Sequence, residues 1–554
     1  MIKQLFKFIG GVHIPQYKDI SCNTTIQQAP IASQLVLPLS QHIGSPSVPI
    51  VHIGDHVLKG QTIAIAEDYV SVNLHAPTSG QIIAIEPRAI PHPSGLPAQC
   101  IVLQSDGKDQ WRERKPIAED YRQLDPSKVR NLIREAGIVG LGGAGFPSFI
   151  KMNPGPSGHI DTLILNAAEC EPFITCDDRL LQERADEVIQ GLFILRYALQ
   201  AKHCVIAVED NKAKAITALN KALETVDQSC IQVTAIPTIY PAGGEKQLIH
   251  TITGRQVPSH GLPIHIGVVV QNVATAAAIY AAIFRDEPLI SRIVTLTGDV
   301  SRPTNYEVLL GTSMQSLIEQ SDDSPQNKIK RIIMGGPMMG FAMHSSDIPI
   351  IKTCNCVIVD KGLTAELKQH GYTMPCIRCG QCADVCPAEL LPQQLYWYTK
   401  SAQWQLSQDY QLFDCIECGC CDYVCPSYIP LVQYYRYAKA QIWEQERETE
   451  KSDHARERHE FRLERIEREK KEREERHRQK KAALGKKDTD PKGEKTKPDP
   501  KKAAIIAAME RVKQKKAQQN IQAKNTDNLT AAQKKQIEEA DARRKKVNDE
   551  DSSS

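Results

Sequence analysis

The chain has 554 residues, enough for roughly three or four domains. Its formal net charge of +2 does not favour a nucleic-acid-binding protein. The opening sequence, MIKQLFKFIGGVHIP, has no apolar core of signal-peptide length, so we expect the 17 cysteines to be reduced thiols and metal ligands rather than the disulfides of an exported protein.

We expect no membrane-spanning helix, because no run of about twenty apolar residues is free of polar interruption. The nearest candidate, residues 266–284, is interrupted by Gln271, Asn272 and Thr275. We interpret it as a buried strand that runs into an alanine-rich helix. The prediction is a cytoplasmic chain that reaches a membrane only through its partners.

Residues 1–110 are predicted to form a small β-rich domain. The runs PIVHIGDHVLKGQTIAIAED and VNLHAPTSGQIIAIEPR contain short strand-like segments separated by Gly, Pro and Asp, which favours a small barrel or sandwich. The region resembles a lipoyl-type hammerhead domain. It offers no obvious lysine for modification, so we expect a structural role.

Residues 120–284 are predicted to form an α/β domain. A helix (SKVRNLIREAG) and a glycine-rich loop come first, and the strands IDTLILNAAE, HCVIAVED and IQVTAIPTIY then alternate with the helices ADEVIQGLFILRYALQA and NKAKAITALNKALETV. This alternation implies a parallel sheet covered by helices on both faces, as in a Rossmann-like fold.

Three further regions complete a multidomain architecture of α/β and α+β parts. Residues 285–350 are expected to form a small α+β, β-grasp-like domain, and residues 364–440 a helical, cysteine-rich module. Residues 441–554 form a charged tail in which opposite charges recur at i,i+4 without an apolar heptad, which favours a solvated helix over a coiled coil. A disordered arm is the alternative, and DPKKAAIIAAMERVKQKKA could form a short amphipathic helix.

The cysteine-rich module contains the pattern C-x2-C-x2-C-x3-C-P twice, in CIRCGQCADVCP and CIECGCCDYVCP. In two-cluster ferredoxins the fourth cysteine of each run binds the other cluster. We therefore predict two [4Fe–4S] clusters, the first held by Cys376, Cys379, Cys382 and Cys425, and the second by Cys386, Cys415, Cys418 and Cys421. Zinc is a poor alternative, because zinc sites use two cysteine pairs. Gln381 occupies the place of Cys420 in the first run, so Cys420 is not expected to be a ligand.

The glycine-rich loop, GLGGAGFPSFIK, is a candidate phosphate site. Its glycines permit close approach of the backbone and its lysine adds positive charge, although the pattern matches neither a Walker loop nor G-x-G-x-x-G. The segments NAAECEP, at a strand end, and YPAGGEKQLI supply polar groups able to bond a flavin or a nicotinamide ribose. Alternatively, the carboxylates belong to a solvated loop. The predicted cofactor-binding residues are Gly140, Gly142, Gly143, Gly145, Lys151, Asn166, Glu169, Glu171, Gly243, Gly244 and Glu245.

These segments resemble the NADH-oxidising flavoprotein subunit of respiratory complex I, whose flavin loop reads G-R-G-G-A-G-F-P followed by a lysine. NAAECEP resembles its N-A-D-E-x-E-P, and YPAGGEKQLI its later Gly-Glu-Glu segment. Leu141, Ala168 and Lys246 depart from that pattern. The order of regions over residues 5–440, from GGVHIP to the twin cysteine runs, resembles the RnfC family of the Rnf ion-translocating electron transport complex.

The resemblance implies noncovalent FMN on the glycine loop and Lys151, NADH as substrate, and electron flow through the two clusters. It implies partners in a membrane redox complex, including a ferredoxin-like subunit and integral membrane subunits that move Na⁺ or H⁺. The chain would be peripheral, on the cytoplasmic side of the inner membrane. Two alternatives are a soluble NADH dehydrogenase (diaphorase) module of a hydrogenase-type enzyme and a non-catalytic iron–sulfur relay adaptor.

Overall fold

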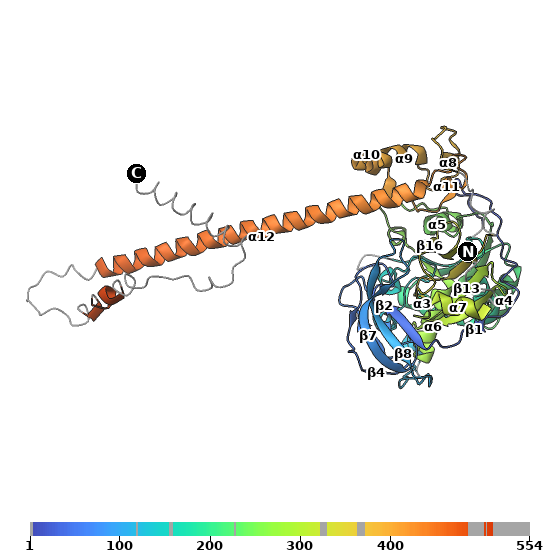
Figure 1. Ribbon diagram of the computed structural model, residues 1–554, viewed down its shortest axis with the longest axis horizontal. Helices are drawn as coiled ribbons and strands as arrows, with labels where there is room; N and C mark the ends of the chain where they lie inside the picture. The colour runs from blue at the N-terminus through green and yellow to red at the C-terminus, as the bar shows by residue number, and fades with distance from the viewer. Residues whose placement is uncertain are drawn as a thin grey trace, which may run out of the picture. The chain divides into compact units, whose positions relative to one another are not determined.

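The computed structural model describes residues 4–117, 120–153, 159–226, 229–321, 329–362, 372–485, 504–505 and 507–512. The chain divides into two units, Met1–Glu450 and Lys451–Ser554. Figure 1 shows the helices and strands of both.

Two small antiparallel sheets form the N-terminal domain. One has the order β2 (Gln34–Pro38), β8 (Pro97–Ser105), β7 (Gly80–Ala89), β4 (His56–Val57), and the other β3 (Val48–Pro49), β5 (Thr62–Ile65), β6 (Leu74–His75). Leu35 lies opposite Leu103, and Leu37 opposite Ile101, in the β2–β8 pair. All four side chains are fully buried, because alternate residues of a strand point to the same face. The predicted β-rich N-terminal domain is confirmed.

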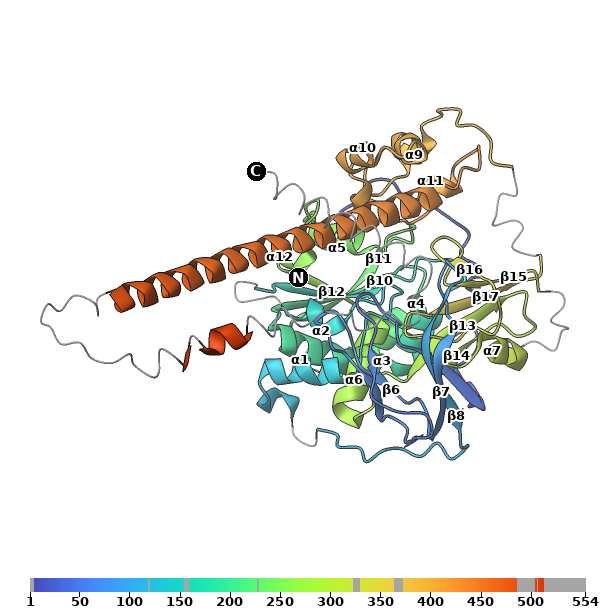
Figure 2. The same cartoon turned by 60° about the vertical axis from the view of Figure 1, so that its left-hand side comes forward.

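The α/β domain is built on a parallel sheet of order β11 (Ile231–Ile236), β10 (His203–Glu209), β9 (Thr162–Ala167), β12 (Val268–Asn272). Its helices are α1 (Pro126–Glu135), α2 (Ser148–Lys151), α3 (Cys176–Leu199), α4 (Ala213–Leu223), α5 (Glu245–Thr253) and α6 (Val273–Arg285), with the 3₁₀ turns η1 (Tyr121–Gln123) and η2 (Pro263–Ile266). Apolar residues of α1, α3, α4 and α6 pack on one face and those of α5 on the other. Figure 2 shows α5 on the opposite side of the sheet from α1, α3 and α6. The predicted parallel sheet covered on both faces is confirmed, including the strand and helix at residues 266–284.

A mixed six-stranded sheet follows, of order β1 (Gln27–Gln28), β14 (Thr304–Leu309), β13 (Ser291–Gly298), β17 (Cys356–Asp360), β15 (Arg331–Met334), β16 (Phe341–Met343). Helix α7 (Met314–Ser321) packs on it. The sheet includes strands from outside the predicted range 285–350, because β1 comes from the start of the chain and β17 lies just before the cysteine-rich module.

Residues 5–28 lie outside the two sheets of the N-terminal domain and cross other domains. The Phe6 amide donates to the Thr251 carbonyl (3.0 Å), and Val12 forms an isolated bridge with Tyr240. Further along, β1 pairs in parallel with β14. The first residues of the chain therefore hold the α/β domain and the six-stranded sheet together.

A buried lysine joins the N-terminal domain to the α/β domain. Lys352 is 1% exposed, and its Nζ donates to the carbonyls of Asn73 and Gly137 (2.8 Å each). Burial lowers the pKa of Lys352 to about 7. The junction therefore contains a titratable group whose charged form is disfavoured by its surroundings.

The cysteine-rich module consists of short helices packed on the start of a long one. Its elements are α8 (Gln381–Asp384), α9 (Pro392–Lys400), α10 (Trp404–Asp409), η5 (Leu412–Asp414), α11 (Cys420–Tyr423) and the first turns of α12 (Leu431–Gly485). The helix predicted between the two cysteine runs is α9. In α12, Tyr435, Ala438 and Ile442 are buried in the module core, so the packed part extends just beyond the predicted end at residue 440.

In the second unit, the described part of α12 is a charged helix with almost every side chain exposed. Arg465 pairs with Glu469 (3.6 Å) and Arg476 with Glu472 (3.8 Å), each at i,i+4 spacing. The predicted solvated helix is confirmed for this part of the tail. Residues 507–512 are also helical, and much of the predicted amphipathic segment around them lies outside the described residues. Among the described residues, no helix has the length and apolar character needed to cross a membrane.

Candidate iron–sulfur and flavin sites

The eight predicted cluster ligands gather around two separate cavities in the cysteine-rich module. One cavity is lined by Cys376, Cys379, Cys382 and Cys425. The other is lined by Cys386, Cys415, Cys418 and Cys421, together with Cys420. The structure thus brings together the two interleaved sets that the spacing predicts. We call these the outer and the inner cysteine sets.

The local backbone explains this interleaving. Gly380 and Gly419 precede the short helices α8 and α11 with φ of +84° and +82°, so both runs make the same turn. Because α8 ends at Asp384, Cys386 leaves its own loop and reaches the inner set. Apolar residues such as Leu390, Leu395 and Val432 complete the inner cavity. Four thiols around an apolar cavity are a donor set that suits a [4Fe–4S] cluster.

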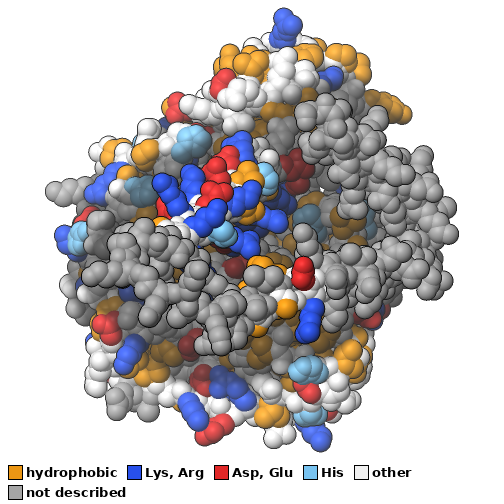
Figure 3. Space-filling model, turned by 90° about the vertical axis from the view of Figure 1, so that its left-hand side faces the viewer, with side chains coloured by type: hydrophobic (Ala, Val, Ile, Leu, Met, Phe, Trp, Pro, Cys, Tyr) orange, Lys and Arg blue, Asp and Glu red, His pale blue; other side chains and the backbone are white. Residues whose placement is uncertain are grey.

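The two sets differ in exposure. In the inner set, Cys418 and Cys421 are buried, whereas Cys379 of the outer set is exposed. Ile377, beside Cys379, is 67% exposed, and Trp397 of α9 is 40% exposed. Figure 3 shows hydrophobic side chains gathered at the upper end of the molecule, at the height of α8 and α9 in Figure 1. The outer set therefore lies beneath an exposed, partly apolar surface.

Cys420 has a protein partner of its own. Its side chain is fully buried, and its Sγ lies 4.0 Å from the carbonyl oxygen of Tyr240, to which it donates. It packs with Tyr240, Cys170 and Val12. This position accounts for a fifth cysteine beside a site that needs four ligands.

The glycine-rich loop closes on itself. The Gly140 amide donates to the Phe146 carbonyl (2.7 Å), and the Gly145 amide to the Gly140 carbonyl (3.2 Å). Between them Gly142 and Gly143 are exposed, and a Cβ at Gly143 would meet no protein atom within 4 Å beyond its chain neighbours. The loop therefore presents open backbone, which suits the close approach of a phosphate group.

Four of the predicted residues meet beside this loop, at the carboxyl end of the sheet. Lys151 Nζ donates to Glu245 Oε1 (2.6 Å) and to the Val270 carbonyl of β12 (3.4 Å). Asn166, near the end of β9, donates through Nδ2 to the Gly243 carbonyl (2.8 Å). Parallel sheets bind ligands at this edge, so these groups are placed to line a cofactor site.

Gly243 and Gly244 form the tight entry to α5. A Cβ at Gly243 would lie 2.4 Å from the Ala168 carbonyl oxygen, and one at Gly244 would lie 2.5 Å from Gln247 Oε1. Gly244 is the N-cap residue, so the helix begins at Glu245. The absence of side chains at these two positions lets the start of α5 approach the end of β9.

Glu169 points into the protein rather than into an open site. Its carboxylate accepts from Lys212 Nζ (2.9 Å) and from the Asp177 amide (2.8 Å). Burial opposes its charge, but the ammonium groups of Lys212 and Lys18 outweigh burial and keep the pKa of Glu169 below its ordinary value. The alternative of a solvated loop is therefore wrong for Glu169, which is 7% exposed.

Glu171 turns toward the six-stranded sheet. Its carboxylate accepts from the amides of Met338 (3.1 Å) and Met339 (2.8 Å), in the turn between β15 and β16. Burial raises the pKa of Glu171 to about 7. Both carboxylate oxygens thus have protein partners, although the sequence suggested a bond to flavin or nicotinamide.

Sequence reasoning missed a polar pair beside the glycine loop. Asn272 Nδ2 donates to Asp177 Oδ2 (2.6 Å), and a Cβ at Gly142 would lie 3.5 Å from Asn272. Burial, followed by the nearby charge of Glu169, raises the pKa of Asp177 to about 7. The segment CDDR that follows NAAECEPFIT carries this aspartate, and only the fold shows that it faces the start of α6.

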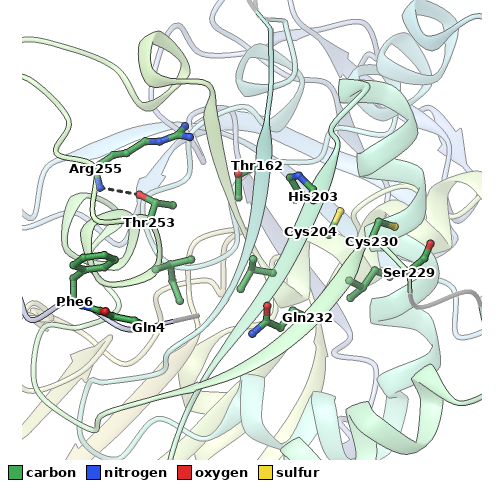
Figure 4. Close-up of a pocket in the computed structure, with 13 residues that line it drawn as sticks. Gln4, Phe6, Thr162, His203, Cys204, Ser229, Cys230, Gln232, Thr253 and Arg255 are labelled. Carbon is green, nitrogen blue, oxygen red and sulfur yellow. Dashed lines mark hydrogen bonds between the residues drawn. The ribbon is translucent and has the colours of Figure 1, made fainter. Parts of the chain in front are cut away.

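A separate cavity lies at the opposite, amino-terminal end of the parallel sheet. It is lined by the first residues of three strands, Thr162, His203 and Ile231, and by Arg255 (Figure 4). The Arg255 amide donates to Thr253 Oγ1 (3.1 Å). The predicted flavin residues, all of them described, do not line this cavity, so it is not the candidate flavin site.

Four family models match successive parts of the chain. They are the RnfC barrel sandwich hybrid domain (residues 6–108), the Nuo51 FMN-binding domain (133–281), the SLBB domain (293–342) and the 4Fe-4S dicluster domain (375–429). Together with the two cysteine sets and the open glycine loop, they define an iron–sulfur flavoprotein.

Curated relatives narrow the class to one family. The chain is 45% identical over 515 residues to the RnfC protein of the ion-translocating oxidoreductase complex of Serratia proteamaculans, a match that covers 93% of this chain and 70% of that protein. It is 48% identical over 395 residues to the protein of the same name from Pseudomonas aeruginosa, covering 71% of this chain. The chain belongs to the RnfC family of ion-translocating oxidoreductase complexes.

The chain is shorter in its match than some of these relatives. It spans 50% of the Pseudomonas aeruginosa protein and 65% of one from Yersinia pestis. Among solved structures, an NAD⁺-reducing [NiFe]-hydrogenase in its H₂-reduced state is similar with a TM-score of 0.40 and 20% identity, over 57% of this chain and 62% of that one.

Proposed function

We propose that the chain is the peripheral electron-input subunit of a membrane-bound, ion-translocating NADH/ferredoxin oxidoreductase complex. Bound FMN would take two electrons from NADH and pass them one at a time to two [4Fe–4S] clusters. The complex would supply a ferredoxin-like subunit and integral membrane subunits, and this chain would lie on the cytoplasmic side of the inner membrane.

The observation that carries this proposal is that one helix start contacts both candidate sites. Glu245, the first residue of α5, bonds to Lys151 beside the glycine loop. The next residue, Lys246, pairs with Asp414 (3.0 Å), which immediately precedes Cys415. Gln247 Nε2 then donates to the Pro387 carbonyl (3.0 Å), next to Cys386. A cofactor on the loop would therefore lie close to the inner cysteine set.

The residues take distinct roles in this proposal. Gly142 and Gly143 present the open backbone for the FMN phosphate, and Lys151 supplies positive charge shared with Glu245. Asn166 holds the entry to α5 through the Gly243 carbonyl. The inner and outer cysteine sets each hold one cluster. The Rossmann-like and β-grasp-like descriptions, the hammerhead likeness and the boundaries 1–110, 120–284, 285–350, 364–440 and 441–554 belong to the same proposal.

Anaerobic purification tests it directly. We expect about eight irons and about one FMN per chain, and bleaching of the flavin and cluster absorbance when NADH is added. A preparation with iron but without flavin, unaffected by NADH, would overturn the input role and favour the relay adaptor. Recovery only in the soluble fraction, without membrane partners, would favour the soluble dehydrogenase module.

A lysine pair supplies the matched variants. Lys151→Met should lower the FMN content several-fold, because the cofactor phosphate loses its nearest cation. Lys202→Met is the control, since Lys202 is 58% exposed and its nearest carboxylate, on Asp161, lies 4.0 Å away. Iron content should stay unchanged in both variants. Equal flavin content in the two would refute the assignment of the loop.

A further inference from the structure

The inner cysteine set is the one that the rest of the protein holds. The Gly11 amide donates to the Val385 carbonyl (2.9 Å), Gln247 donates to Pro387, and Tyr240 donates to Cys418. These contacts reach both loops that supply inner ligands. The inner set is therefore built into the interface between the cysteine-rich module and the α/β domain.

Tyr240 is the most enclosed of these contacts. Its side chain is 1% exposed, and its hydroxyl donates to the Cys418 carbonyl at 2.6 Å. Its own backbone is fixed on both sides, because its amide donates to the Val12 carbonyl (3.0 Å) and its carbonyl accepts from the Val12 amide (2.8 Å). The ring therefore projects from a rigid backbone onto the loop that carries Cys415, Cys418 and Cys421.

A third domain closes the same junction. The turn at residues 335–340, between β15 and β16, is held by the Glu171 carboxylate through the Met338 and Met339 amides. The Met338 carbonyl lies 3.0 Å from where a Cβ of Gly419 would be, and the Tyr240 hydroxyl lies 3.5 Å from Glu171 Oε1. The six-stranded sheet thus supports the inner loop from the side opposite the cysteines of α8.

We propose that Tyr240 is a positioning residue for the cluster held by the inner cysteine set, with Glu171 and the turn at residues 335–340 fixing it in place. The inference rests on the proposed function only for the identity of the cluster. The hydroxyl neutralises part of the negative charge on the Cys418 carbonyl oxygen and fixes the direction of the peptide beside that ligand. Hydrogen bonds and burial around a cluster set its reduction potential, so this bond tunes the inner cluster and leaves the outer cluster alone.

The test is a redox titration of Tyr240→Phe in the full chain, followed by EPR under chemical reduction with dithionite. The outer signal is assigned with Cys379→Ser. We expect the inner signal of Tyr240→Phe to change its line shape and to shift to lower potential, because the freed carbonyl places more negative charge near the added electron. The outer signal should stay in place.

Tyr197→Phe is the matched control. Tyr197 also donates its hydroxyl to a carbonyl, that of Leu124 (2.6 Å), within the α/β domain and away from both cysteine sets. We expect no change in either signal. If Tyr240→Phe loses iron, loss of half of it with the outer signal intact supports the proposal. Loss of both clusters, equal shifts of both signals, or no shift at all would overturn it. The titration uses no NADH, so absence of flavin in the wild type would refute the proposed function without affecting this result.

Discussion

The contact between Gly10 and the inner cysteine loop gives a sharp test of how the N-terminal segment acts. Gly10 has φ of +73°, and a Cβ added there would lie 2.7 Å from the carbonyl carbon and oxygen of Val385 and 2.8 Å from the carbonyl carbon of Cys386. All three atoms are backbone, so no side chain can rotate away to make room. Gly10→Ala must therefore displace the N-terminal segment or the backbone of a cluster ligand.

Gly107 provides a control for the backbone conformation alone. Its φ is +71°, and a Cβ there would meet no atom within 4 Å beyond its chain neighbours. Placing alanine in this region of φ costs about 1–2 kcal/mol, and both variants share that cost. Overpacking at Gly10 adds roughly 1–3 kcal/mol. For a region of this size each kcal/mol lowers the melting temperature by about 2–4 °C, so we expect a difference of roughly 2–12 °C between the variants.

The assay is heat-induced loss of the visible absorbance of the clusters, with iron content measured before heating. Gly10→Ala should lose absorbance at a lower temperature than Gly107→Ala when the two are measured at equal protein concentration. Equal midpoints and equal iron content in the two variants would refute the reasoning, because they would show that the close approach of Gly10 to Val385 and Cys386 has no energetic consequence.

Buried groups and the tail give three other predictions. Lys352 has a pKa of about 7 when folded, against about 10.4 when unfolded, so the unfolded chain binds the extra proton between these values. Wild-type stability should fall as the pH is lowered from about 10 to about 7, and Lys352→Met should lack this dependence in thermal melts across that range. Cys420→Ser should keep full iron content, whereas Cys418→Ser should lose about half; iron loss in Cys420→Ser would contradict its role outside the ligand set. Truncation after Glu450 should preserve iron content but reduce recovery with membranes, and unchanged membrane recovery would count against a docking role for the tail.

Local spacing accounts for what could be predicted in the cysteine-rich module. Two-residue gaps confine three thiolates to one tight loop, and the fourth cysteine falls beyond the end of α8 or α11, where it faces the other loop. The alternation of strands and helices in residues 120–284 likewise depends on short-range periodicity, and it predicted the parallel sheet. The charged part of α12 needs no tertiary partner, because its i,i+4 pairs lie within the helix.

The direction of individual polar side chains could not be predicted in the same way. Asn166, Glu169 and Glu171 lie within six residues, yet they bond to three different parts of the protein: the Gly243 carbonyl, Lys212, and the amides of Met338 and Met339. The sequence places all three at a strand end, where the chain leaves the sheet and each residue can turn separately. Which partner each one meets depends on residues between about 40 and 170 positions away.

The sequence by itself determined the chemistry of this protein: the ligands of two clusters, their interleaving, the glycine loop and the order of the domains. These features are encoded in short segments, because a cluster loop or a strand end is set by neighbours a few residues apart. The tertiary structure alone decided how the sites are joined. Tyr240, Gln247 and Gly10 carry no local signal, and their roles arise only because burial brings three distant segments against the inner cysteine set, where each polar group must find a partner.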